Sequence, residues 1–144
     1  MAKAFYISVL AVIKAQNQVL VIHKTKFNDG TPRDIWGLPG GKMEHGETEF
    51  ATLKRELSEE LGLLLEDQKI SYLGHIMPGG HEFSFKDGVG SCNLIYQIEL
   101  EKTFTPNFSN ENESYNWLDY SEFLKTKLFS VKVPITEIGT NLSI

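Results

Sequence analysis

The chain has 144 residues, of which 41% are hydrophobic and 23% are charged. These proportions are close to those of average globular proteins, so we expect a single domain over residues 1–144. The net charge of −5 argues against a nucleic-acid groove, since phosphates call for a basic surface, and the single cysteine excludes an intrachain disulfide framework. No apolar run reaches the roughly 18 residues of a membrane span, and the N-terminus lacks a signal-peptide cleavage pattern. We therefore expect a cytoplasmic protein without membrane contact.

The N-terminal part of the chain predicts a β-hairpin followed by loops. Phe5 to Ile13 is a continuous apolar run, typical of a strand buried on both faces. A turn at Gln16-Asn17 and a second strand at Val19 to His23 complete the predicted hairpin. Residues 24–35 contain strong turn signals and predict a loop, and Trp36 to Gly41 is too rich in glycine and proline for regular structure.

Thr48 to Leu61 is the strongest helix prediction. Thr48 or Glu47 can cap its start, and Gly62 stands where a left-handed residue commonly ends a helix. Farther along, strands are predicted at residues 69–76, 92–99 and 114–118. Asp119 with Glu122 resembles a capping box that opens a short helix through Lys127.

The predicted helix carries two stripes of side chains. The apolar stripe, which should face the core, contains Phe50, Leu53, Leu57 and Leu61. The neighbouring acidic stripe contains Glu49, Glu56, Glu59 and Glu60. Like charges four residues apart cost roughly 0.2–0.5 kcal/mol in an isolated helix, and the helix C-terminus also disfavours anions. Binding of Mg²⁺ or Mn²⁺ would offset this repulsion, while a solvated charged face is the alternative interpretation.

A longer pattern favours the metal site. From Gly41 the chain continues with five residues, Glu47, seven residues and then Arg55-Glu56-Leu57-Ser58-Glu59-Glu60-Leu61-Gly62-Leu63. This matches the Nudix box, G-x5-E-x7-R-E-U-x-E-E-x-G-U with U aliphatic, at every specified position. At average residue usage, such a match arises by chance in a chain this long roughly once in 10⁷. The chain therefore resembles the Nudix hydrolases.

The resemblance implies an α+β fold, an α/β/α sandwich around a mixed β-sheet. It also implies hydrolysis of a nucleoside diphosphate linked to another moiety, with a MutT-like (d)NTP pyrophosphohydrolase as the favoured activity. ADP-ribose or nucleotide-sugar cleavage is an alternative, since Pro78 follows the box by about 15 residues as in ADP-ribose-cleaving members. A non-catalytic module that senses a nucleotide is an alternative from another class. The expected partner is the nucleotide, and a homodimer is possible.

The resemblance also implies roles for residues of the box. Glu59 and Glu60 are the expected metal ligands, and Glu56 is expected to be a ligand or the general base. The carbonyl oxygen of Gly40 is an expected further ligand, and the cofactor is Mg²⁺, which Mn²⁺ can replace. The expected catalytic residues are Glu56, Glu59 and Arg55. Arg55 pairs with Glu47 to hold the loop–helix–loop shape, which also requires Gly41 and Gly62.

Family members often add a carboxylate from the loop before a strand tryptophan, here Trp117. Glu111 is the favoured ligand from this loop, and Glu113 is the alternative. Near the end of the second predicted strand, His23, Lys24 and Arg33 could meet phosphates, although solvated charges are the favoured interpretation. Four aromatic residues could stack on a base but are expected to pack in the core: Phe83, Phe85, Tyr96 and Phe108.

Overall fold

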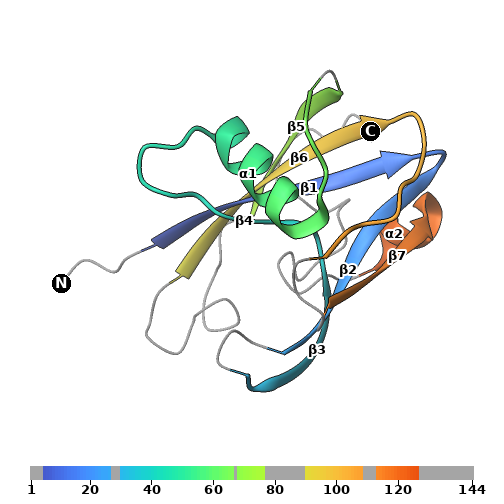
Figure 1. The fold of residues 1–144 in the computed structure, drawn as a ribbon, viewed down its shortest axis with the longest axis horizontal. Coiled ribbons are helices and arrows are strands. Elements are labelled where there is room, and N and C mark those ends of the chain that lie inside the picture. The colour runs from blue at the N-terminus through green and yellow to red at the C-terminus, as the bar shows by residue number, and fades with distance from the viewer. Residues whose placement is uncertain (1–4, 27–29, 67, 77–89, 109–112, 127–144) are drawn as a thin grey trace.

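The computed structural model describes residues 5–26, 30–66, 68–76, 90–108 and 113–126. In this part of the chain, one mixed sheet has helix α1 on one face and the short helix α2 on the other (Figure 1). The strands are β1 (Phe5–Ala15), β2 (Gln18–Lys26), β3 (Pro32–Gly37), β4 (Gly40–Lys42), β5 (Lys69–Ile76), β6 (Gly90–Leu100) and β7 (Glu113–Asp119), and the helices are α1 (Glu49–Leu61) and α2 (Tyr120–Lys125). The predicted sandwich around a mixed sheet is confirmed. Neither helix is long and apolar enough to cross a membrane.

The β1–β2 hairpin opens beyond its turn and makes room for the segment that leads to α1. β1 pairs in parallel with β6 along its whole length, and Lys14 faces Val19 of β2 next to the turn. β7 pairs with β2 from Gln18 at the turn to Lys24, whereas β4 pairs with β1 and β3 pairs with β2 only farther from the turn. The N–H of Ala11 donates to the carbonyl of Pro39 at 2.9 Å. The connection from β3 to β4 therefore lies where β1 and β2 separate.

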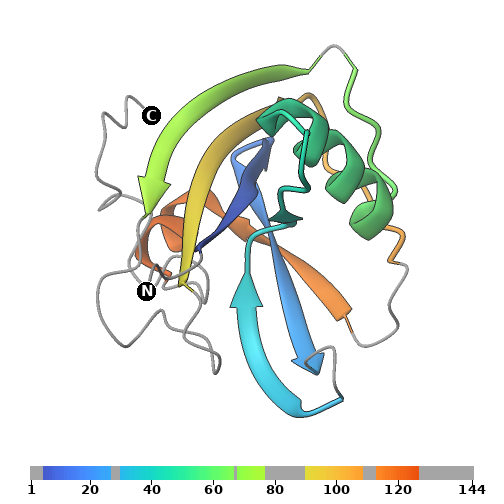
Figure 2. The same ribbon diagram turned by 90° about the vertical axis from the view of Figure 1, so that its left-hand side faces the viewer.

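The predicted burial of β1 on both faces is confirmed for its second half and is wrong at Ile7, which is 43% exposed. Val9 to Ile13 are at most 5% exposed. Val9, Ala11 and Ile13 pack with Leu53, Leu57 and Leu61 of α1, whereas Leu10 and Val12 pack with Phe123 of α2. Figure 2 shows α1 beside the sheet and the strong curvature of β5 and β6. The sheet thus separates two apolar layers, and the one under α1 supports the acidic side chains of that helix.

The loop prediction for residues 24–35 and the irregular segment predicted at Trp36–Gly41 are wrong in part, because β3 and β4 form there. Pro32 is the first residue of β3, a position where the sheet tolerates proline. Gly40 has φ +133°, and a Cβ atom there would lie 2.1 Å from the carbonyl oxygen of Val9. Glycine therefore allows the close pairing of β4 with β1, a non-local contact that local turn signals do not reveal.

Both predicted ends of α1 are confirmed. The Thr48 hydroxyl accepts a hydrogen bond from the N–H of Ala51 at 3.1 Å, and Gly62 adopts a left-handed conformation with φ +69°. The predicted apolar stripe is wrong at Phe50, which is 47% exposed. Thr52 takes the inward position in the first turn and is fully buried.

The strand predicted at residues 69–76 has the bounds of β5, and those predicted at 92–99 and 114–118 lie within β6 and β7. The predicted capping box at Asp119 is wrong, since its side chain makes no capping hydrogen bond and α2 ends at Lys125. The N–H of Tyr120 instead donates to the carbonyl of Asn17 at 2.9 Å, which docks the start of α2 on the β1–β2 turn. Lys127 and the tail lie outside the described residues.

Candidate functional site

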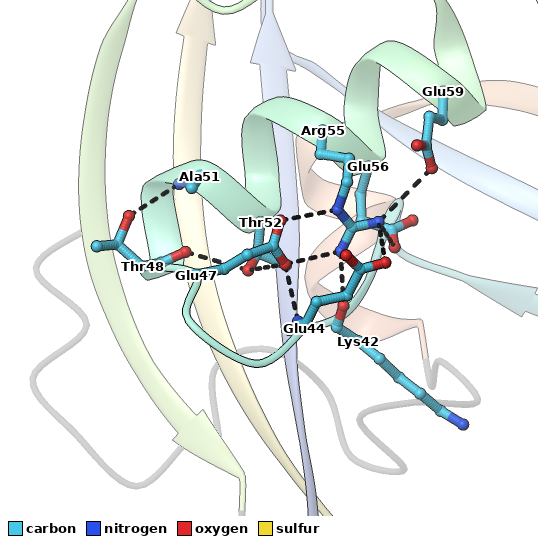
Figure 3. Close-up of polar contacts among 9 residues, drawn as sticks. All are labelled: Lys42, Glu44, Glu47, Thr48, Ala51, Thr52, Arg55, Glu56 and Glu59. Atoms are coloured by element: carbon cyan, nitrogen blue, oxygen red, sulfur yellow. Dashed lines mark hydrogen bonds and ion pairs between the residues drawn. The ribbon is translucent and has the colours of Figure 1, made fainter.

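Arg55 gathers carboxylates from α1 and from the loop before it (Figure 3). Its Nε and Nη2 atoms donate to the Glu47 carboxylate at 2.8 and 2.9 Å, and its Nη1 atom donates to Glu56 at 2.8 Å. Longer ion pairs reach Glu59 at 3.6 Å and Glu44 at 3.8 Å. We call these five residues the Arg55 cluster. Arg55 therefore offsets part of the repulsion among the glutamates of the helix without a metal ion.

Within the Arg55 cluster, Glu47 ties the loop to the helix. Its carboxylate also accepts hydrogen bonds from the N–H of Glu44 at 2.8 Å and from the Thr52 hydroxyl at 3.1 Å. The hydrogen bonds from Arg55, followed by that from the Glu44 N–H, lower the pKa of Glu47 to about 2. The same pairing raises the pKa of Arg55 further above its usual range. Both groups are therefore charged at neutral pH and hold the loop–helix shape.

A second group of charges lies where α1, β2 and β7 meet. Lys24 Nζ is 3.6 Å from Oε1 of Glu60 and 4.0 Å from Oε1 of Glu113. The side chains of Lys24, Glu60 and Glu113 are 24, 11 and 14% exposed. We call these three residues the Lys24 cluster. Glu60 also accepts a hydrogen bond from the Gly40 N–H at 3.2 Å, so the cluster touches β4.

Glu60 is the most deeply placed carboxylate of the site. Its Oε1 atom is buried and has no hydrogen-bond partner among the described residues. Burial raises the pKa of Glu60 to about 7, although the charge of Lys24 and the N–H of Gly40 act in the opposite direction. The negative charges of Glu113 and Glu56 raise this pKa further. Glu60 thus has an unused oxygen that would gain from a cation.

Gly41 allows Glu56 to lie directly against β4. A Cβ atom at position 41 would lie 2.4–2.6 Å from the carboxyl atoms of Glu56. Any side chain there would displace this carboxylate. Glycine is therefore required at the first position of the box for a steric reason. Glu56 and Glu60 both approach β4, which begins at Gly40.

The described residues contain no group of three His, Cys, Asp or Glu side chains arranged to hold a metal ion. Glu56 and Glu59 turn toward Arg55, while Glu60 turns toward Lys24. The donors still fit a hard divalent cation, because they are carboxylate oxygens and Glu60 has one buried oxygen without a hydrogen bond. A metal ion would have to redirect these side chains as it binds.

Several candidates from the sequence have other positions. Glu111 lies outside the described residues, as do Pro78, Phe83 and Phe85, and the Arg33 side chain is not described. His23 is not simply solvated, since it stacks on Trp36 with ring centroids 4.6 Å apart and pairs with Asp34. Tyr96 and Phe108 are half-buried against the core under α1, which agrees with the packing interpretation.

Lys24 is the site residue that the sequence interpretation undervalued. The favoured interpretation as a solvated charge is wrong, because the side chain is ion-paired with Glu60 and Glu113. The signal was the alternation along β2, in which Leu20 and Ile22 pack in the core under α1. Lys24 continues this alternation by two more residues, which places it on the face that α1 covers.

The chain is similar to proteins of known families. A family model of the NUDIX domain matches residues 4–137. The 8-oxo-dGDP phosphatase NUDT18 of Mus musculus is 39% identical over 61 residues, which are 42% of this chain and 18% of that protein. The nucleoside triphosphatase NudI of Enterobacter sp. (strain 638) is 28% identical over 135 residues, which cover 80% of this chain and 89% of that protein. Against several curated relatives, NUDT18 included, this chain spans only 18–24% of their length.

Solved structures share the fold. The E. coli dihydroneopterin triphosphate pyrophosphohydrolase matches with a TM-score of 0.68 and 25% identity, over 94% of this chain and 97% of that one. The arrangement of helices and strands in this chain is therefore the fold of that solved structure.

Proposed function

The chain belongs to the NUDIX domain family, and from this we propose that it is a metal-dependent hydrolase of nucleoside diphosphates linked to another moiety. Among these compounds we propose nucleoside triphosphates or deoxynucleoside triphosphates as substrates, cleaved at a pyrophosphate linkage. The similarity to a nucleoside triphosphatase and to a triphosphate pyrophosphohydrolase over most of the chain supports this choice. The 8-oxo-dGDP phosphatase supports a nucleotide substrate in general.

The observation that carries the proposal is the buried Oε1 atom of Glu60, which has no hydrogen bond among the described residues, while Oε2 of the same carboxylate accepts the Gly40 N–H. A buried carboxylate oxygen without a hydrogen bond is costly, and a bound ion or a catalytic role is a known reason for a native protein to retain one. We assign Glu56, Glu59 and Glu60 as the carboxylates that hold Mg²⁺ or Mn²⁺, with the Gly40 carbonyl as a further donor. Glu111 or Glu113 completes the set.

A bound divalent ion would neutralise phosphate charge and lower the pKa of the attacking water. The carboxylates of the chain do the rest of the chemistry. Glu56 or Glu59 accepts the proton of the water that attacks phosphorus. Arg55 acts through Glu47 and Glu56, to which it donates hydrogen bonds, and is therefore a positioning residue. With a net charge of −5, the chain depends on cations to bind a polyanionic substrate.

The test incubates purified protein with each compound of a panel and identifies the products by chromatography and mass spectrometry. Release of phosphate or pyrophosphate alone is not a sufficient readout, because ADP-ribose, nucleotide sugars and dinucleoside polyphosphates are cleaved into two phosphorylated products. The panel contains nucleoside triphosphates, 8-oxo-dGDP, ADP-ribose, dinucleoside polyphosphates and nucleotide sugars, each with Mg²⁺, with Mn²⁺ and with EDTA. We expect release of a nucleoside monophosphate and pyrophosphate from triphosphates, and no turnover in EDTA. Turnover of ADP-ribose alone would replace the proposed substrate class. A flat panel would contradict the enzyme and favour a nucleotide-sensing module.

A further inference from the structure

Lys24 is held loosely between two carboxylates that are mostly removed from water. Its ammonium group lies 3.6 Å from Glu60 and 4.0 Å from Glu113, beyond hydrogen-bond distance in both cases. None of the three side chains is more than 24% exposed. The ion pairs therefore depend on charge attraction alone, and they leave the Oε1 atom of Glu60 without a hydrogen bond.

The pairing of the strands places Lys24 close to Glu113, whichever rotamer its side chain adopts. Lys24 and Glu113 are directly opposite each other in the antiparallel pairing of β2 with β7. Oppositely charged side chains at such positions attract each other. Glu60 reaches the same point from α1 while its second carboxylate oxygen accepts the Gly40 N–H. Three separate elements thus bring one positive and two negative charges together.

The charges of this cluster do not balance. Glu60 and Glu113 together have two negative charges when both are ionised, and one ammonium group offsets only half of that. A divalent cation at the same carboxylates would offset both charges and would repel an ammonium group a few ångströms away. A divalent ion and the Lys24 ammonium group therefore compete for the same oxygens.

We propose that Lys24 is the internal counter-ion of Glu60 and Glu113 in the metal-free chain, and that a divalent cation displaces its ammonium group when it binds. The inference rests on the proposed function, because it requires that the metal binds at Glu60. Lys24 is then a positioning residue that keeps the two carboxylates together without metal. It does so at the expense of metal affinity.

The first test measures Mn²⁺ binding by isothermal titration calorimetry for the wild type, Lys24→Met, Lys24→Arg and Lys26→Met. Lys24→Met should bind Mn²⁺ about tenfold more tightly, because a positive charge close to the ion is removed. Lys26 is exposed and lies two residues farther along β2, so Lys26→Met removes the same charge where solvent screens it. Lys26→Met and Lys24→Arg should stay within about threefold of the wild type, since a removed charge is screened in the first and retained in the second.

The second test uses the wild type alone and remains valid if Lys24→Met does not fold. Reductive methylation followed by mass spectrometry reports how accessible each lysine is. With Mn²⁺, Lys24 should become several-fold more reactive, whereas Lys26 should keep its reactivity. Unchanged or weaker Mn²⁺ binding by Lys24→Met overturns the proposal, and so does unchanged reactivity of Lys24 in a wild type that binds Mn²⁺.

The two proposals fail in different ways. A wild type that binds Mn²⁺ and hydrolyses no compound of the panel contradicts the proposed function, while the Lys24 measurements still decide the counter-ion role. A wild type that binds neither Mn²⁺ nor Mg²⁺ overturns both proposals.

Discussion

The Arg55 cluster and the Lys24 cluster both use glutamates of α1, but they satisfy them in different ways. Arg55 donates hydrogen bonds of 2.8–2.9 Å to Glu47 and Glu56. Lys24 stays 3.6 Å from Glu60, whose buried Oε1 atom has no hydrogen-bond partner in the described part of the chain. A planar guanidinium matches carboxylates with several fixed donors, whereas an ammonium group is a point charge on a flexible stem. The Arg55 cluster therefore holds its carboxylates in fixed positions. In the Lys24 cluster, a metal ion could take the place of the lysine as the partner of Glu60.

The pKa values of the two clusters differ in the same sense. Hydrogen bonds from Arg55 lower the pKa of Glu47 to about 2, while burial raises the pKa of Glu60 to about 7. Two glutamates of one motif thus have opposite preferences for the charged form. The Arg55 cluster is therefore complete without a metal ion. Glu60, in contrast, would be stabilised by a bound cation, because Lys24 offsets its charge only in part.

The largest expected effect comes from Glu59, which is held less tightly by Arg55 than Glu47 and Glu56 are. Its side chain is 64% exposed and lies 3.6 Å from Arg55. Glu59→Gln should lower kcat by roughly 10²–10⁴-fold, because a neutral amide is a poorer ligand for a hard cation and stabilises less transition-state charge. The measurement is steady-state kinetics at saturating Mg²⁺, with circular dichroism to verify the fold.

Glu66→Gln is the matched control for this substitution, since Glu66 is exposed and lies beyond the end of α1. Turnover of Glu59→Gln equal to that of the wild type would remove Glu59 from the metal site. It would leave Glu56 and Glu60 as the proposed ligands from α1.

The next effect is on stability as pH changes in the absence of metal. The folded chain raises the pKa of Glu60 from 4.5 to about 7, so protonation of this carboxyl favours folding. Its contribution is complete below pH 4.5 and is lost as the pH rises through about 7. The difference amounts to about 3 kcal/mol. Urea unfolding in EDTA from pH 4.5 to 8 should show this decline in the wild type and not in Glu60→Gln.

Glu47 provides an internal contrast for the pH measurement. Because its pKa falls from 4.5 to about 2, its contribution is present above pH 4.5 and is lost as the pH falls through about 2. The two glutamates therefore act in separate pH ranges and with opposite sign. A decline between pH 4.5 and 7 that persists in Glu60→Gln would show that another group titrates there.

A smaller effect is expected from the metal itself. Mg²⁺ at ten times its Kd should stabilise the wild type by about 1–2 kcal/mol, which is a few degrees in Tm for a domain of this size. The double variant Glu56→Gln/Glu60→Gln should lose most of this shift, because it removes two of the proposed carboxylates. Differential scanning calorimetry measures the shift. NaCl at the same ionic strength should leave the wild type unchanged, and an equal shift with NaCl would indicate mere screening of surface charge.

The smallest expected effect tests whether the Arg55 cluster and the Lys24 cluster act independently. The buried Thr52 hydroxyl lies 3.1 Å from Glu47 Oε1 and 3.1 Å from the Thr48 carbonyl oxygen. Thr52→Val keeps the shape and removes the donor, so it should destabilise the fold by about 1 kcal/mol. Its Kd for Mn²⁺ should equal that of the wild type in calorimetry. A changed Kd would mean that the two clusters are coupled.

The sequence predicted the parts of the molecule that are determined by local contacts. The cap at Thr48, the left-handed Gly62 and the inward leucines of α1 follow from helix geometry, and all are found. β3 and β4 were missed because their hydrogen bonds go to residues distant in sequence, against glycine and proline preferences that are local.

The candidate site shows the same limit. Helical periodicity placed Glu60 in the acidic stripe, but it cannot show that β4 and Lys24 cover this part of the stripe. The same periodicity placed Phe50 in the apolar stripe that should face the core, although its side chain is 47% exposed. The direction of a side chain is local information, whereas its burial depends on which elements pack there. For this reason the sequence identified the glutamates and not the lysine that faces them.

The parallel pairing of β1 with β6 has a consequence for synthesis on the ribosome. Phe5 pairs with Gly90 and Ala15 pairs with Leu100. Each residue of β1 thus pairs with a residue that is synthesised about 85 residues later. The last described helix then closes the first hairpin through the hydrogen bond from Tyr120 to Asn17. Contacts of such long sequence separation slow folding, because the intervening chain must be closed into a loop first. The edge of β1 that pairs with β6 is therefore unpaired until Gly90 to Leu100 have been synthesised, and an unpaired strand edge favours aggregation of the nascent chain.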